Sequence, residues 1–217
     1  KAYSEFTKEE VLDERIPREL IGKIVSGKEY MIKSIKEKFW NVRLPIYLYS
    51  RKLLIDNDIY FPKGRRSNED EVFSIDVFYH AKKLKITDEI FGYYRARSGS
   101  IMSVLNITHA EDIFENVKEL LERYKDEKDS ETKEIIFYMI KRYYKSSMKK
   151  AVQCGRNDVF KKIYQQFRKD CKNYFFKIKS KKFENVELYI LYYTGGIYYT
   201  GGNFLKKFRN KFKAKRG

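Results

Sequence analysis

The apolar residues between positions 107 and 167 repeat at intervals of three and four residues. The first such set is Ile107, Ala110, Ile113, Val117 and Leu120. This spacing places apolar side chains on one face of an α-helix. The same pattern returns in a stretch that Ser130 can cap and again after a break at Gly155. We therefore expect the second half of the chain to fold as a series of amphipathic helices.

Shorter elements are expected in the first hundred residues. Residues 28–39 have helical spacing, Pro45 can begin a second helix at its first turn, and Ser67 or Asn68 can cap a third. Residues 84–87 and 90–94 are predicted to form short strands. The chain has 19 Tyr and 16 Phe but 3 Pro, which favours helices with aromatic cores. The sequence thus predicts an α+β fold that is predominantly α-helical.

An acidic triplet, Glu69-Asp70-Glu71, begins the third of these helices, shortly after the glycine-containing turn of residues 61–64. Carboxylates in a first helical turn complement the helix dipole, so the triplet could be purely structural. A carboxylate at a rigid and partly exposed position could instead accept the proton of a hydroxyl group as a new bond forms. The triplet alone leaves both interpretations open.

Several short segments are informative through their order and spacing along the chain. They are Leu48-Tyr49-Ser50-Arg51-Lys52-Leu53-Leu54, Phe61-Pro62-Lys63-Gly64, Glu69-Asp70-Glu71-Val72-Phe73 and Gly92-Tyr93-Tyr94-Arg95-Ala96-Arg97-Ser98-Gly99-Ser100-Ile101. In order and spacing they resemble the second half of the inverting family 2 glycosyltransferases of the GT-A type, which typically make bacterial surface polysaccharide. The resemblance covers roughly residues 40–105.

The resemblance implies transfer of a sugar from a nucleotide-sugar donor to a hydroxyl of a glycan or a lipid-linked acceptor. It implies that Asp70 is the general base and that Glu69 shapes the acceptor site. It places Arg95, Arg97 and Ser100 on a loop that closes over the donor diphosphate, where guanidinium groups can neutralise the leaving group. The alternative for the two arginines is a solvated strand end.

The chain also departs from the family pattern. Pro45-Ile46-Tyr47 stands where the family often has Trp-Asn-Lys, and no Asp-x-Asp metal motif follows a buried strand. Asp56-Asn57-Asp58 has the right letters, but we interpret it as a turn at a helix end. We therefore expect residues 1–104 to be the acceptor-side half of an incomplete GT-A domain and residues 105–217 to be a helical extension.

The resemblance implies a nucleotide-binding half that this sequence does not contain. Three expectations follow. This chain alone would hold no cofactor and would be inactive, whereas the complete enzyme would use Mn²⁺ or Mg²⁺. An apolar surface left exposed where that half docks could also drive self-association.

The positive charge is concentrated in residues 141–217, which carry 22 Lys and Arg against 4 Asp and Glu. Near the end, five cations alternate with aromatic residues: Lys206, Lys207, Arg209, Lys211 and Lys213. This pattern suits an interfacial helix on anionic lipid, and it also suits a solvated terminus. With no span of about 18 apolar residues, we expect a cytoplasmic protein, peripheral at the inner face of the membrane if the tail binds lipid.

An alternative function comes from the same charge. Residues 141–217 could form a non-catalytic basic module that binds an anionic membrane or RNA, although no recognised nucleic-acid-binding motif is present.

The remaining candidates for site chemistry are two histidines and two cysteines. His80 and His109 have no cysteine or acid at metal-ligand spacing, so we interpret both as structural or solvated. Cys154 and Cys171 are expected to be free thiols in a reducing compartment.

Overall fold

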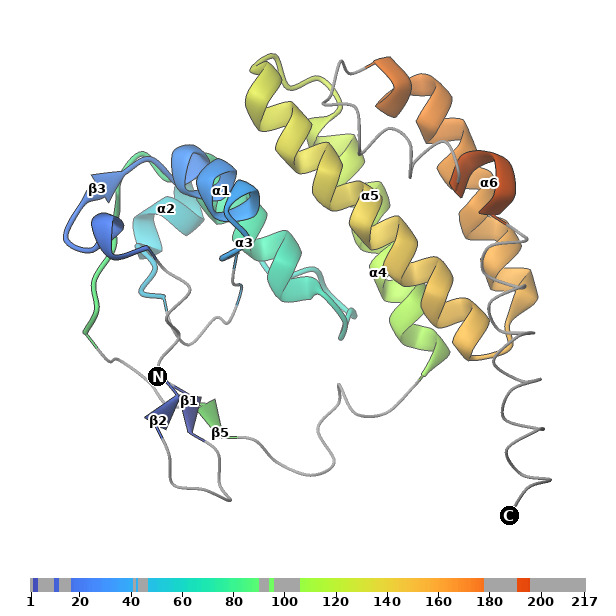
Figure 1. Ribbon diagram of the computed structural model, residues 1–217, viewed down its shortest axis with the longest axis horizontal. Coiled ribbons are helices and arrows are strands. Elements are labelled where there is room, and N and C mark those ends of the chain that lie inside the picture. The colour runs from blue at the N-terminus through green and yellow to red at the C-terminus, as the bar shows by residue number, and fades with distance from the viewer. Residues whose placement is uncertain are drawn as a thin grey trace. The chain divides into compact units, whose positions relative to one another are not determined.

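The structure is a computed structural model of the chain (Figure 1). It describes residues 2–3, 10–11, 17–40, 42, 47–89, 94–95, 106–177 and 191–195. The chain divides into two compact units. The first consists of residues 1–104 and 118–136, and the second of residues 105–117 and 137–217.

Helices α1 (Gly27–Lys36), α2 (Arg51–Asp56) and α3 (Glu69–His80) lie wholly in the first unit. The 3-10 turn η1 (Arg18–Leu20) precedes them. Serine side chains cap the N-termini of the first two helices. Ser26 accepts a hydrogen bond from the backbone N–H of Glu29 at 3.1 Å, and Ser50 accepts one from the N–H of Leu53 at 3.4 Å. Each hydroxyl thereby satisfies one of the N–H groups that a helix start leaves without a backbone partner.

Helix α3 is the centre of the first unit. All its residues from Val72 to Phe78 are buried, which is expected of a helix that other elements cover on several sides. Helix α1 packs against it through Tyr30, whose ring lies 5.1 Å from that of Phe78. At Gly27 the two helices lie so close together that a Cβ atom would overlap the backbone carbonyl of Phe78.

The first unit also contains short strands. Strand β1 (Ala2–Tyr3) pairs antiparallel with β2 (Glu10–Val11) and parallel with β5 (Tyr94–Arg95). Strand β3 (Ile24–Val25) pairs antiparallel with β4 (Leu84–Lys85). The β3–β4 pair joins the start of α1 to the segment that follows α3, so it helps to fix the position of both helices.

The long helices are α4 (Ile107–Tyr124), α5 (Ser130–Gln153) and α6 (Asn157–Asn173), followed by the 3-10 turn η4 (Phe175–Lys177) (Figure 1). Helices α4 and α5 contribute residues to both units. Within the second unit the two helices are joined by Ser147, whose hydroxyl donates to the carbonyl of Ala110 at 2.6 Å. The buried side chains of that unit include Ala110, Ile113, Phe114, Val117, Phe137, Ile140, Tyr144, Phe160, Ile163 and Phe167.

The predicted fold class, α+β and predominantly helical, is confirmed. Two details of the prediction were wrong. Helix α2 begins at Arg51 and not at Pro45, because Ser50 provides the cap. Ser130 is the first residue of α5, and the carboxylate of Asp129 accepts from the N–H of Thr132 in its place. Asn68, one of the two predicted caps of the third helix, is the N-cap residue of α3, although its side chain makes no capping hydrogen bond.

Two further observations concern segments singled out in the sequence. Asp56, Asn57 and Asp58 form the end of α2 and the turn after it, as predicted. In the part of the chain that the structure describes, no helix combines the length and the apolar character needed to cross a membrane.

Candidate functional site

Asp70 lies in the first turn of α3, at the end of a tightly turned segment. Gly64 and Asn68 both have positive φ angles, 77° and 59°, so the backbone between them reverses sharply before the helix begins. The Asp70 side chain is half-buried, and its Oδ1 accepts a hydrogen bond from the N–H of Glu71 at 2.9 Å. Removal from water raises the pKa of Asp70, and the nearby charge of Glu71 raises it further.

The two neighbouring acids differ in their surroundings. Glu71 accepts a hydrogen bond from the indole Nε1 of Trp40 at 2.9 Å, which ties the start of α3 to the segment after α1. Glu69, like Asp70, is half-buried in the first turn. The structure thus brings Glu69 and Asp70 together at one helix end, as the sequence predicted, and gives Glu71 a structural partner that the sequence did not indicate.

A cluster of aromatic rings lies against α3 next to Asp70. Phe73, three residues after Asp70 and so almost one turn along the helix, is 4% exposed. The ring of Phe61 stacks on it with centroids 4.2 Å apart and planes inclined by 6°. The ring of Tyr49 meets it edge-on at 5.3 Å. Phe73 therefore holds two segments distant in sequence against the beginning of α3.

Tyr49 has an unusual environment within this cluster. Its hydroxyl oxygen is buried and has no hydrogen-bond partner among the residues that the structure describes. Burial raises the pKa of Tyr49 to about 12, with a further contribution from the charge of Asp70. The Tyr49 phenol therefore stays protonated at neutral pH, close enough to Asp70 for that carboxylate to affect its pKa.

A buried ionic network supports α3 further along the helix. Asp76 is 2% exposed, and its carboxylate accepts from the hydroxyl of Tyr124 at 2.5 Å and pairs with the guanidinium of Arg123. Glu119, one turn earlier on α4, pairs with Arg123 and with Arg65. Because Arg65 follows Gly64 directly, this network connects the turn before Asp70 to α4.

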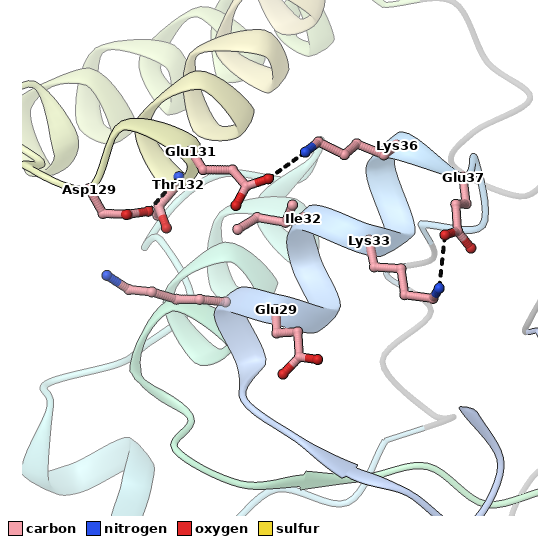
Figure 2. A pocket seen from close by; sticks show the side chains of 9 residues that line it. Glu29, Ile32, Lys33, Lys36, Glu37, Asp129, Glu131 and Thr132 are labelled. Carbon is pink, nitrogen blue, oxygen red and sulfur yellow. Dashed lines mark hydrogen bonds and ion pairs between the residues drawn. The ribbon is translucent and has the colours of Figure 1, made fainter. Parts of the chain in front are cut away.

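A shallow cleft of about 530 Å³ lies between α1 and the beginning of α5 (Figure 2). Its charged side chains are largely paired. Lys36 pairs with Glu131 across the cleft, and Lys33 pairs with Glu37 along α1 at 2.8 Å. Lys28, another lining residue, lies 4.0 Å above the ring of Tyr79 and bonds to Glu127 at 3.3 Å. These pairs join α1 to the α4–α5 turn, and we assign this cleft a structural role.

The remaining predicted site residues are described only in part. Arg95 belongs to the two-residue strand β5. Arg97 and Ser100 lie outside the described residues, as do the tail cations Lys206, Lys207, Arg209, Lys211 and Lys213. Their assigned roles stay predictions.

No group of metal-ligating residues occurs within the described ranges: nowhere do three or more His, Cys, Asp or Glu side chains gather closely enough to hold an ion. His109 is buried and His80 half-buried, and both cysteines are free thiols as predicted. Burial raises the pKa of Cys171, which is fully enclosed in the second unit.

Comparison with known proteins gives a partial match. Over 72 residues the chain is 35% identical to poly(ribitol-phosphate) beta-N-acetylglucosaminyltransferase TarS of Staphylococcus aureus, in the strains Mu50 / ATCC 700699 and MW2. The matched stretch makes up 33% of this chain and 12% of each relative. No family model matches the chain, and no solved structure matches it. The chain is thus similar over a third of its length to a bacterial glycosyltransferase.

Proposed function

We propose that this chain takes part in glycosyl transfer, as the acceptor-side portion of an inverting GT-A glycosyltransferase of family 2. The reaction moves a sugar from a nucleotide-sugar donor to a hydroxyl of a glycan or lipid-linked acceptor. Asp70 takes the proton of that hydroxyl as the oxygen attacks the anomeric carbon, and the nucleotide diphosphate leaves from the opposite face. Glu69 contacts the acceptor, and Arg95, Arg97 and Ser100 bind the donor diphosphate.

The environment of Asp70 carries this proposal. A general base works best when its pKa lies near the working pH, and half-burial beside Glu71 moves the pKa of Asp70 in that direction. The carboxylate also stands on a well-supported helix, because Phe73 and Asp76 anchor α3 on the following turns. The partial similarity to a glycosyltransferase supports the type of reaction.

Apart from Arg95, the residues that would bind the donor and any divalent cation lie, in this proposal, beyond those described. Location in the cytoplasm, at the inner face of the membrane where a lipid-linked acceptor would lie, is part of the same proposal.

The proposal is tested by replacing Asp70 with Asn in the whole protein that carries this sequence. Removing a general base typically lowers the rate by about 10² to 10⁴. We expect transfer to fall in that range while the affinity for the nucleotide-sugar, measured by calorimetry, stays within about twofold, since Asp70 does not touch the donor in this proposal. Glu69→Gln is the matched control and should alter the KM for the acceptor more than kcat. Normal turnover of Asp70→Asn would refute the assignment.

The charge of the second unit favours a second candidate, binding to an anionic surface. Residues 141–177 carry 12 Lys and Arg against 2 acids. Of these two, Asp170 is buried and accepts from Tyr144 and Gln166, while Asp158 pairs with Arg156 at 2.7 Å. The exposed surface of α5 and α6 therefore keeps a large positive excess.

This candidate is tested with vesicles of phosphatidylglycerol and phosphatidylcholine and with a single-stranded RNA. Replacing Lys161 and Lys162, both exposed on α6, with Glu should weaken binding to anionic vesicles and reduce its sensitivity to salt. Asp70→Asn should leave vesicle binding unchanged. Preference for RNA over anionic vesicles would assign the basic surface to nucleic acid.

A further inference from the structure

Phe61 presents a flat aromatic surface to solvent at a fixed position. Its side chain is 45% exposed although one face of the ring is covered by Phe73. The 4.2 Å stacking at 6° orients the ring, and Phe73 is itself buried and fixed edge-on by Tyr49. The neighbouring Tyr60 is 60% exposed. A large apolar ring left open to water at a rigid position is a feature of binding surfaces.

The backbone brings this ring close to Asp70. The turn after Phe61 reverses at Gly64, where φ is 77°, and the chain then enters α3 at Glu69. Phe61 stacks on the residue that lies almost one helical turn after Asp70. The exposed ring and the half-buried carboxylate are therefore held on the same end of one helix, through contacts within a single compact unit.

We propose that the exposed face of Phe61 is the platform on which a pyranose ring of the acceptor lies, with its reacting hydroxyl directed toward Asp70. This inference rests on the proposed function. The C–H bonds on one side of a pyranose are weakly positive, and they match the negative face of an aromatic ring. The hydroxyl groups at the rim of the sugar stay free to meet a carboxylate.

The charges around the platform are nearly balanced. Glu69, Asp70 and Glu71 place three carboxylates in the first turn of α3. Lys63, Arg65 and Arg66 place three cations on the segment between Phe61 and that helix, and the helix N-terminus adds about half a positive charge. The flat apolar face of Phe61, rather than a net charge, is therefore what would hold the pyranose.

Saturation-transfer NMR on the whole protein tests this inference without donor or turnover. The probes are methyl β-D-glucopyranoside, methyl β-D-galactopyranoside and the methyl glycoside of N-acetyl-β-D-glucosamine. We expect at least one of these neutral glycosides to receive saturation mainly on the hydrogens of one ring face.

Substitutions at Phe61 distinguish stacking of the sugar on a flat aromatic face from a general apolar contact. Phe61→Tyr should retain the signal, whereas Phe61→Leu, which keeps apolar contact with Phe73 but no planar face, should weaken it about fivefold. Leu48→Ala is the control, since Leu48 is an exposed apolar residue outside this stack, at 83%. Circular dichroism checks that each variant is folded.

Two results would overturn the platform: no saturation of any neutral glycoside by the unaltered protein, or a Phe61→Leu signal equal to the original. The Asp70→Asn variant distinguishes a failure of Asp70 as the general base from a failure of Phe61 as the platform. If that variant retains both glycoside binding and transfer, the base assignment fails and the platform stands. If it loses transfer while Phe61→Leu binds normally, the platform fails and the base assignment stands.

Discussion

The guanidinium of Arg123 pairs with the carboxylate of Asp76, which is 2% exposed on α3. Tyr124 donates to the same carboxylate at 2.5 Å. Despite both partners, burial raises the pKa of Asp76, so the loss of water outweighs the attraction of the positive charge. Because desolvation of the Asp76 carboxylate offsets the attraction of its partners, we infer that the network fixes the position of α3 more than it adds to the free energy of unfolding.

Removing one partner of this network should cost more than neutralising the acid. Arg123→Ala leaves an uncompensated buried carboxylate, and we expect it to lower the free energy of unfolding by about 2–4 kcal/mol. Asp76→Asn keeps an acceptor for Tyr124, and we expect it to cost about 1 kcal/mol or less. Urea unfolding followed by fluorescence measures both, and the reverse order would contradict this account.

The same carboxylate predicts a dependence of stability on pH. Because the folded-state pKa of Asp76 lies above the ordinary value of 3.8, the folded protein binds this proton more tightly than the unfolded protein does. The contribution of this group to stability is then fully present below the unfolded pKa, and it is lost as the pH rises through the folded pKa. Subtracting the pH profile of the free energy of unfolding of Asp76→Asn from that of the unaltered protein isolates this contribution. If the ion pair with Arg123 dominated, the difference would rise with pH instead of falling.

Gly27 is predicted to tolerate no side chain. An alanine inside a helix normally stabilises it relative to glycine, but here the added Cβ would overlap the backbone carbonyl of Phe78. We expect Gly27→Ala to lower the free energy of unfolding by about 1–3 kcal/mol. Glu29→Ala, at an exposed position on the same helix, is the control and should change stability by less than about 0.5 kcal/mol. An unchanged midpoint for Gly27→Ala would show that α1 and α3 can separate freely.

Glu119 is predicted to position the turn that precedes Asp70. It pairs with Arg65 just after Gly64 and with Arg123 on its own helix. Partly exposed ion pairs contribute about 0–1 kcal/mol to stability, so Glu119→Ala should remain folded. Freed from Glu119, the turn would place Asp70 less accurately, and we expect kcat to fall about tenfold or more with a smaller change in the acceptor KM.

The control for this prediction is Lys52→Ala, which breaks the exposed ion pair between Lys52 and Asp56 on α2. It should leave both kinetic constants unchanged. Equal rates for Glu119→Ala and the unaltered protein would limit Glu119 to a structural role.

The stability of Asp70→Asn distinguishes a catalytic carboxylate from a structural one. The folded environment disfavours the charged form of Asp70, as its raised pKa indicates. Removing the charge should therefore leave the thermal midpoint equal or higher. A helix-capping acid behaves differently, because its loss typically costs about 1 kcal/mol. A clear fall in the midpoint would favour the interpretation of the acidic triplet as a helix cap.

Local patterns predicted much of this fold. The apolar spacing from Ile107 onward gave the course of α4, and the break at Gly155 separated α5 from α6. Both depend on interactions between residues close in sequence. The start of α2 was misplaced because Pro45 and Ser50 are both plausible helix signals, and the hydroxyl of Ser50 provides the cap.

The candidate site was predictable only in part, because its contacts join residues that are far apart in the sequence. The acidic triplet was visible in the sequence, but its partners come from distant segments. Trp40 bonds to Glu71 across 31 positions, and Phe61 finds Phe73 only once the turn at Gly64 has formed. A charged aspartate within the mainly apolar stretch from Val72 to Phe78 was a signal for the Asp76 network, but nothing in the sequence pointed to Arg123 as its partner.

The most direct test of the central claim is the pH dependence of kcat/KM for sugar transfer by the whole protein and by Asp70→Asn. A general base must be unprotonated, so the rate should rise with pH through a midpoint above the ordinary aspartate pKa of 3.8. In Asp70→Asn we expect a low rate without this acid limb. An unchanged acid limb in Asp70→Asn, or a rate within a few-fold of the original, would contradict the assignment of Asp70 as the base.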